Sequence, residues 1–146
     1  MNNSLSAEPV QTAHRRTTGR QSLARFRLRS HADFQRAYGA SRKRQSASMS
    51  WFLAPQSAKE ASPRVGLTAG KVLGKAHDRN RIKRRMREVL RRHVELLPEG
   101  FDLILHPRRM VLTIDFRKLE AEVVRILGEA RLEAEKARAA AVAGRA

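Results

Sequence analysis

The sequence contains no cysteine, which excludes disulfide bonds, thiolate catalysis and cysteine-ligated zinc sites. A cysteine-free chain suits a reducing compartment, and we predict a cytoplasmic location. No apolar run approaches the roughly 18 residues of a membrane-spanning helix, so we expect no membrane partner. Aromatic residues make up only 5% of the 146 residues, but hydrophobic residues make up 41%, enough for one modest core.

Acidic residues are scarce in one part of the chain. Residues 15–92 hold 22 Lys or Arg but only four Asp or Glu, whereas the remainder holds nine basic and ten acidic residues. The net charge of +17 and the pI of about 11.7 exceed what solubility requires. A protein with this charge is expected to bind a polyanion, and nucleic acid is the most common one. The middle of the chain therefore carries the expected binding surface.

The chain divides by composition into three segments. Residues 1–24 are polar and lack periodicity, which predicts a disordered extension, although their Arg- and Ser-rich composition leaves an organelle transit peptide open. Residues 25–130 contain the periodic segments of one folded domain. Residues 131–146 are rich in Ala and Glu, and we expect a helical or disordered tail there.

The periodic segments predict a small two-layer α/β sandwich with the element order α-β-β-α-β-(β)-α. The first helix begins at Ser30, which forms a capping box with Asp33. Asp78 is the expected N-cap of a second, basic helix that stops before Pro98, and Asp115 is that of the last helix. Strands are expected over residues 49–54, 64–69 and 101–107, with an additional short edge strand over 110–114.

The basic helix carries the strongest functional signal. Six of the ten residues in the run RNRIKRRMRE, residues 79–88, are Arg or Lys. Ile82, Met86 and Val89 fall on one side at helical spacing, which predicts a core-facing stripe. Neighbouring arginines on the other sides repel each other, so the helix gains from a bound anion such as a nucleic-acid phosphate. Charge alone does not distinguish DNA from RNA.

An aromatic pair precedes this helix. Phe34 and Tyr38 lie four residues apart and therefore share one face of the first helix. Their spacing is equally compatible with a place in the core and with a platform on which bases of single-stranded nucleic acid stack. Phe52, in the following strand, is more typical of core.

Residues with catalytic spacing are missing from the sequence. Residues 66–71 resemble a phosphate-binding loop but are one residue too short, and Val72 stands where Ser or Thr is needed. The five histidines lack metal-ligand spacing, and the acids of the basic region are isolated from one another. We therefore expect the protein to contribute no catalytic side chain.

The segment GKAHDRNRIKRRMRE, residues 74–88, resembles the signature of the protein subunit of bacterial ribonuclease P. The segments RLRSHADFQRAY (27–38), RVGLTAGK (64–71) and FDLIL (101–105) resemble the same family. The resemblance runs from about residue 25 to residue 127. Lys71 is followed by Val72 where the family commonly has a second basic residue.

The resemblance implies an α/β sandwich with a left-handed βαβ crossover, and a 1:1 complex with a catalytic RNA. That complex removes the 5′ leader of precursor tRNA by hydrolysis, using Mg²⁺ held by the RNA and the substrate. Phe34, Tyr38 and Lys71 are the implied leader contacts. The implied contacts to the catalytic RNA are Arg79, Asn80, Arg81, Lys83, Arg84 and Arg87. A structural RNA-binding role, as in a ribosomal protein or an RNA chaperone, is the alternative.

Overall fold

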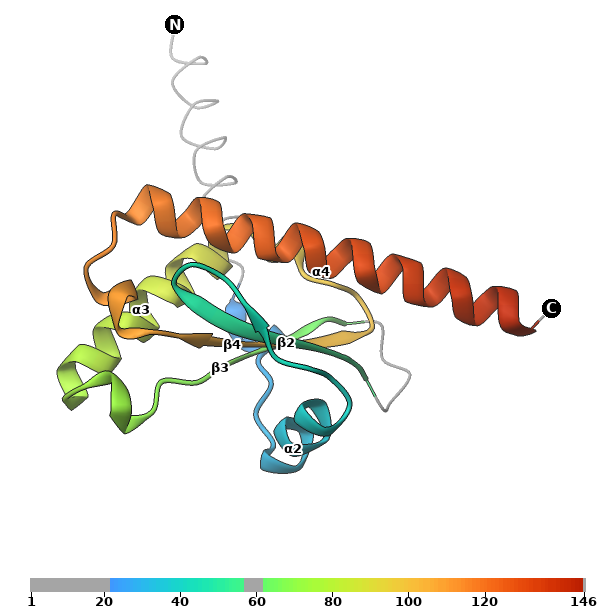
Figure 1. The fold of residues 1–146 in the computed structure, drawn as a ribbon, viewed down its shortest axis with the longest axis horizontal. Coiled ribbons are helices and arrows are strands. Elements are labelled where there is room, and N and C mark those ends of the chain that lie inside the picture. The colour runs from blue at the N-terminus through green and yellow to red at the C-terminus, as the bar shows by residue number, and fades with distance from the viewer. Residues whose placement is uncertain (1–21, 57–61, 146) are drawn as a thin grey trace, which may run out of the picture.

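The computed structural model describes residues 22–56 and 62–145. A four-stranded sheet lies between one short helix and two longer ones (Figure 1), and the mixed α/β fold expected from the sequence is confirmed. The disordered extension expected over residues 1–24 lies outside the described residues, except for its last three positions, where Leu23 is buried.

The helices and strands follow each other in a simple order, with short 3₁₀ helices (η) between them. They are η1 Leu23–Phe26, α2 His31–Gly39, β1 Arg44–Gln45, β2 Met49–Pro55, β3 Arg64–Leu67, η2 Lys71–Leu73, α3 Ala76–Arg92, η3 Val94–Leu96, β4 Phe101–Pro107, η4 Arg109–Leu112 and α4 Phe116–Arg145.

The strands lie in the order β1-β2-β4-β3, so the last strand enters between the two longer earlier ones. β2 pairs with β4 antiparallel, and β3 pairs with β4 parallel. A parallel pair needs a crossover connection, which α3 provides. The basic helix is thereby fixed to the sheet at both ends, and the left-handed sense of this crossover stays a prediction from the resemblance.

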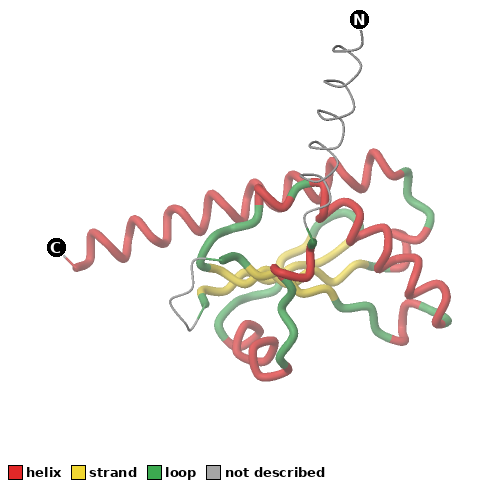
Figure 2. The backbone as a smooth tube through the Cα atoms, turned by 180° about the vertical axis from the view of Figure 1, so that it is seen from behind, coloured by secondary structure: helices red, strands yellow, loops and turns green. Residues whose placement is uncertain are grey.

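The two faces of the sheet are covered unequally (Figure 2). Alternate residues of β4 point to opposite faces, as a strand requires: Leu103 and Leu105 belong to the main core with α3 and α4. Ile104 points the other way, into a small cluster with α2. The aromatic side chains of this second cluster are only partly buried, so the α2 face combines packing with exposed surface.

The short strand expected over residues 110–114 is wrong, because this segment forms η4. Both edges of β4 are already occupied by β2 and β3, which leaves no place for a strand that turns back beside it. The guanidinium group of Arg85 instead binds the carbonyl oxygens of Val111, Leu112 and Ile114. These bonds favour a tight turn over an extended segment.

The predicted N-cap of α2 is confirmed, whereas that of α3 is wrong. The hydroxyl of Ser30 accepts from the backbone N–H of Asp33, 3.4 Å away, so this cap is confirmed. Asp78 is not the N-cap of α3: Lys75 holds that position without a side-chain bond, because the chain turns at Gly74 with φ of 124°. Asp78 lies in the first turn, where a carboxylate still favours the helix dipole.

α4 is the longest helix and its last turns extend beyond the sheet (Figure 1). The carboxylate of Asp115 accepts from the backbone N–H of Lys118 at 3.4 Å, which confirms the predicted cap. Leu119, Val123 and Ile126 fall on one side at helical spacing, and all three are buried. None of the helices in the described part of the chain is long and apolar enough to cross a membrane.

Candidate RNA interface

One side of α3 is anchored in the core. Ile82, Met86, Val89 and Leu90 are buried, as the apolar stripe in the sequence predicts. His93, at the C-cap, is partly buried and its Nε2 lies 2.8 Å from a carboxylate oxygen of Glu120 on α4. Because this side packs against the sheet and α4, the orientation of the remaining sides of the helix is fixed.

The opposite side of α3 presents cations outward. Asn80, Arg81, Arg84 and Arg87 are exposed, whereas Arg79 and Lys83 are partly buried. Within the described residues, the guanidinium groups of Arg84 and Arg87 contact no carboxylate. The helix therefore carries positive charge that the protein itself does not neutralise, which is the electrostatic condition for binding a phosphate backbone.

Three arginines of α3 have contacts within the protein. The guanidinium group of Arg85 turns back to the carbonyl oxygens of η4, and burial, together with the nearby Arg81, lowers the pKa of Arg85 from the ordinary value. Arg91 binds Glu88, which Arg92 also contacts at 3.1 Å. The sequence could not distinguish these arginines from Arg84, because the difference depends on neighbours far along the chain.

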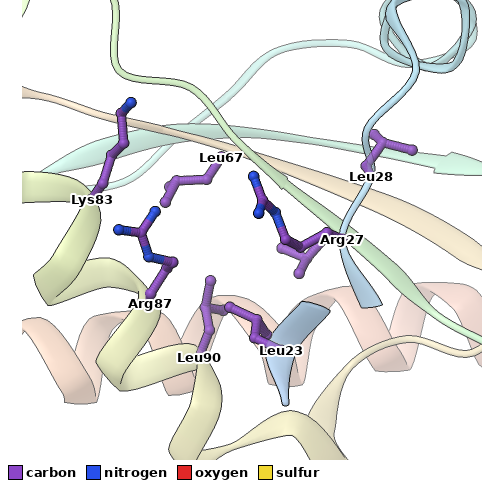
Figure 3. Close-up of a pocket in the computed structure, with 8 residues that line it drawn as sticks. Leu23, Arg27, Leu28, Leu67, Lys83, Arg87 and Leu90 are labelled. Atoms are coloured by element: carbon purple, nitrogen blue, oxygen red, sulfur yellow. The ribbon is translucent and has the colours of Figure 1, made fainter. Parts of the chain in front are cut away.

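A pocket of about 120 Å³ opens beside this surface, between α3, β3 and the segment after η1 (Figure 3). Lys83, Arg87 and Arg27 line its rim above a floor that includes Leu23 and Leu90. Sequence reasoning missed Arg27. The alternation of basic and apolar side chains over residues 27–29 was the available signal, because alternation is typical of an extended segment, and Arg27 does form a parallel bridge to β3.

The aromatic pair lies on the other face of the sheet. The rings of Phe34 and Tyr38 are 6.3 Å apart between centroids, and Tyr38 meets Phe52 edge-on at 5.0 Å. The hydroxyl of Tyr38 lies 2.8 Å from Nε2 of His106 on β4. All four rings are partly buried, so each contributes packing and leaves part of its surface open to a ligand.

Burial favours the neutral forms of Tyr38 and His106 in this aromatic cluster. Burial raises the pKa of the Tyr38 hydroxyl from its ordinary value. Burial, assisted by the charge of Lys43, lowers the pKa of His106. Both groups therefore favour the neutral form, in which they can share a hydrogen bond and offer ring surface. Phe52 and His106 were not predicted here, since their nearness to α2 depends on the sheet register.

Lys71 is apart from this aromatic cluster. It opens η2, after the carboxyl end of β3, and its side chain is exposed. Thr68, three residues earlier, donates its backbone N–H to the carbonyl of Leu105, so Lys71 follows the end of the sheet where His106 lies. Val72 is 91% exposed beside it. The structure thus brings Phe34 and Tyr38 together and leaves Lys71 outside their cluster, at the end of the sheet.

These features define a class: a small, strongly basic α/β protein whose parallel crossover is an arginine-rich helix. A family model described as Ribonuclease P matches residues 24–131. The chain belongs to the ribonuclease P protein family.

The match to this chain extends over most of the length of several relatives. The ribonuclease P protein component of Chloroflexus aggregans is 36% identical over 107 residues, which is 73% of this chain and 78% of that protein. The one from Thermobifida fusca is 33% identical over 105 residues, 68% and 71% of the two chains. The solved ribonuclease P protein of Thermotoga maritima has 26% identity and a TM-score of 0.61, covering 70% of this chain and 96% of that one.

Proposed function

We propose that this protein, as the protein component of ribonuclease P, binds the catalytic RNA through the outward side of α3. The observation that carries the proposal is the division of α3 into a buried apolar side and an exposed side with Arg84 and Arg87 free of carboxylate contacts. Arg81 and Asn80 are exposed on the same helix, and Arg79 and Lys83 flank them partly buried. Arg side chains suit phosphate because their planar fork donates two parallel hydrogen bonds.

We further propose that the α2 face holds the single-stranded 5′ leader of precursor tRNA. Phe34 and Tyr38 supply partly exposed rings, and base–aromatic stacking contributes about 1–3 kcal/mol per base. Lys71 at the rim would contact a leader phosphate. Val72, next to it, offers no charge, so we expect one electrostatic contact fewer than two lysines would give.

In this proposal the chemistry of leader removal belongs to the RNA, in a 1:1 complex in the cytoplasm. The hydrolysis uses Mg²⁺ that the RNA and the substrate hold. The side chains on the α2 face fit this division, since the two carboxylates there, Asp33 and Asp102, each contact Arg36 and Arg64. Carboxylates engaged in this way are poor ligands for a hard cation.

Reconstitution tests the proposal. The full-length protein, added to ribonuclease P RNA, should lower the Mg²⁺ concentration needed for cleavage and should make the complex bind precursor tRNA more tightly than mature tRNA. If neither quantity changes, the protein is an RNA-binding protein of another kind, such as a ribosomal protein. Cleavage of precursor tRNA at the mature 5′ end by RNA-free protein would contradict the assignment of the chemistry to the RNA.

A further inference from the structure

We propose that a closed ring of four charged side chains, Asp33, Arg36, Arg64 and Asp102, fixes α2 at its height above the sheet and so shapes the leader-binding face. These residues touch neither α3 nor the aromatic rings in the contacts described above. The inference rests on the proposed function, because it assigns a positioning role toward the leader.

The ring closes through four links, each between an arginine and an aspartate. On α2, Arg36 contacts Asp33 at 2.7 Å. Arg36 also reaches across to Asp102 on β4 at 2.9 Å. Arg64 on β3 binds both oxygens of Asp102, at 2.9 and 3.0 Å, and returns to Asp33 at 3.0 Å. Three separate elements, α2, β3 and β4, are therefore joined by one set of charge-assisted bonds.

Burial makes the ring costly to open. The side chain of Asp102 is 0% exposed, and a buried carboxylate that loses its partners pays a large desolvation penalty. The hydrogen bond from Arg36, aided by Arg64, lowers the pKa of Asp33 despite partial burial. The hydrogen bond to Asp102 raises the pKa of Arg64. Both shifts favour the charged forms of Asp33 and Arg64, and the ring pairs two arginines with two aspartates.

α2 has little else at this end to hold it. Ala37 is its single buried residue, and a nine-residue helix is unstable by itself in water. Next to Asp33, the ring of Phe34 covers Gly66, where an added Cβ would come within 2.7 Å of it. The hydroxyl of Tyr38 contacts His106 near the far end. Asp33 and Arg36 hold the helix on both sides of Phe34 in the sequence, and Tyr38 follows two residues after Arg36.

A second buried carboxylate provides a matched control on the other face. Glu122 on α4 is buried and accepts from the hydroxyl of Ser46 and from the backbone N–H of Ser48 at 2.8 Å. Its burial opposes ionisation, but these hydrogen bonds lower its pKa overall. Asp102→Asn and Glu122→Gln each replace one buried carboxylate by its amide, and only the first touches α2.

The absence of cysteine permits a direct measurement of the position of α2. Spin labels on Gln35→Cys in α2 and Glu129→Cys in α4, both exposed sites, report the distance between the helices by pulsed electron resonance in the full-length protein. We expect a narrow distribution for the unchanged background and for Glu122→Gln. Asp102→Asn, and Arg36→Met as a second variant that keeps the aliphatic stem, should broaden or shift it.

The functional arm uses holoenzyme assembled with the catalytic RNA. Asp102→Asn and Arg36→Met should reduce the preference for precursor over mature tRNA roughly tenfold, the factor expected when one base loses its stacking contact with a displaced ring. Assembly with the RNA should stay unchanged, and Glu122→Gln should leave the preference intact. If Asp102→Asn does not fold, Arg36→Met is used for both the distance and the binding measurements. If Arg36→Met also does not fold, Arg36→Lys takes its place. Lys keeps the charge, but its ammonium lacks the two-pronged fork of Arg.

Unchanged label distances together with unchanged preference would overturn the inference, as would an equal loss of preference in Glu122→Gln. These results differ from failure of the proposed function itself. That failure would appear in the unchanged protein, whose holoenzyme would then show no preference for precursor tRNA, whatever the label distances are.

Discussion

α2 and α3 lie on opposite faces of the same sheet and are held there by opposite means. α3 buries four apolar side chains and turns cations outward. α2 buries only Ala37, is attached by charges, and leaves aromatic rings partly open. On α3 the anchor and the proposed ligand surface use different side chains. On α2 the rings of Phe34 and Tyr38 pack on the sheet and also leave ring surface open, so the ionic contacts carry part of the attachment.

The largest expected effect comes from truncating a side chain on the buried apolar side of α3. Met86 is fully buried in the main core, so Met86→Ala should lower the free energy of unfolding by about 2–5 kcal/mol. Chemical denaturation followed by circular dichroism measures this. A loss below about 1 kcal/mol, small for a truncated core side chain, would mean that α3 does not depend on apolar packing, and the comparison with α2 would fail.

The next effect concerns the surface of α2. Phe34→Leu keeps apolar contact with the sheet at Gly66 but removes the flat ring. Binding of precursor tRNA to the holoenzyme should weaken by about 1–3 kcal/mol, the contribution of one stacked base. Filter binding with precursor and mature tRNA measures it. Equal weakening for both RNAs, or a loss of assembly with the catalytic RNA, would assign Phe34 to the core alone.

Two adjacent arginines on α3 differ in their contacts. Arg84 is exposed, whereas Arg85 binds backbone carbonyls of η4. Arg84→Ala should reduce the slope of log affinity for the catalytic RNA against log salt by about 0.7–0.9, one phosphate contact, and leave stability unchanged. Arg85→Ala should leave this slope unchanged and lower the stability. Affinity titrations between low and moderate salt, with thermal melts, separate the two, and identical behaviour would contradict the assignment.

The smallest expected effect is a pH dependence of stability that comes from Asp33 in the charged ring. The pKa of Asp33 is lowered, mainly by its hydrogen bond from Arg36, so the folded state binds its proton less readily than the unfolded chain. The associated stability is present above the ordinary value of 3.8 and is lost as the pH falls through the lower folded value. Asp33→Asn should flatten the acid limb of the stability curve, measured by melting temperature against pH. An unchanged limb would show that the ring adds nothing to stability.

The parts of the fold that depend on local periodicity could be predicted from the sequence. The stripe of Ile82 and Met86, the buried strand β4 and the core face of α4 all follow from spacing along one element. The parts that depend on pairing over distance could not. Asp102 meets Arg36 across 66 positions, and nothing in either neighbourhood marks the partner.

The same limit explains the errors at the site. Arg85 and Arg84 are neighbours with the same side chain, and only the position of η4 makes one structural. The segment over residues 110–114 has strand-like composition, but its backbone carbonyls are taken by that arginine. Phe52 and His106 join the aromatic pair because β2 and β4 are adjacent, a consequence of the strand order that local patterns do not contain.

The strand order has one more consequence, for contacts between copies of this chain. An edge strand with free backbone groups invites another molecule to extend the sheet. At one edge, β1 has only two residues, and Arg44 within it is held across Trp51, with its guanidinium 4.8 Å from the ring centroid, by an ion pair to Glu133. At the other edge, the backbone N–H of Leu28 donates to Val65 of β3 at 2.9 Å. One margin of the sheet therefore ends in a two-residue strand with a charged side chain, and the other is partly covered by residues 27 and 28. Both features disfavour the addition of a further strand from another molecule.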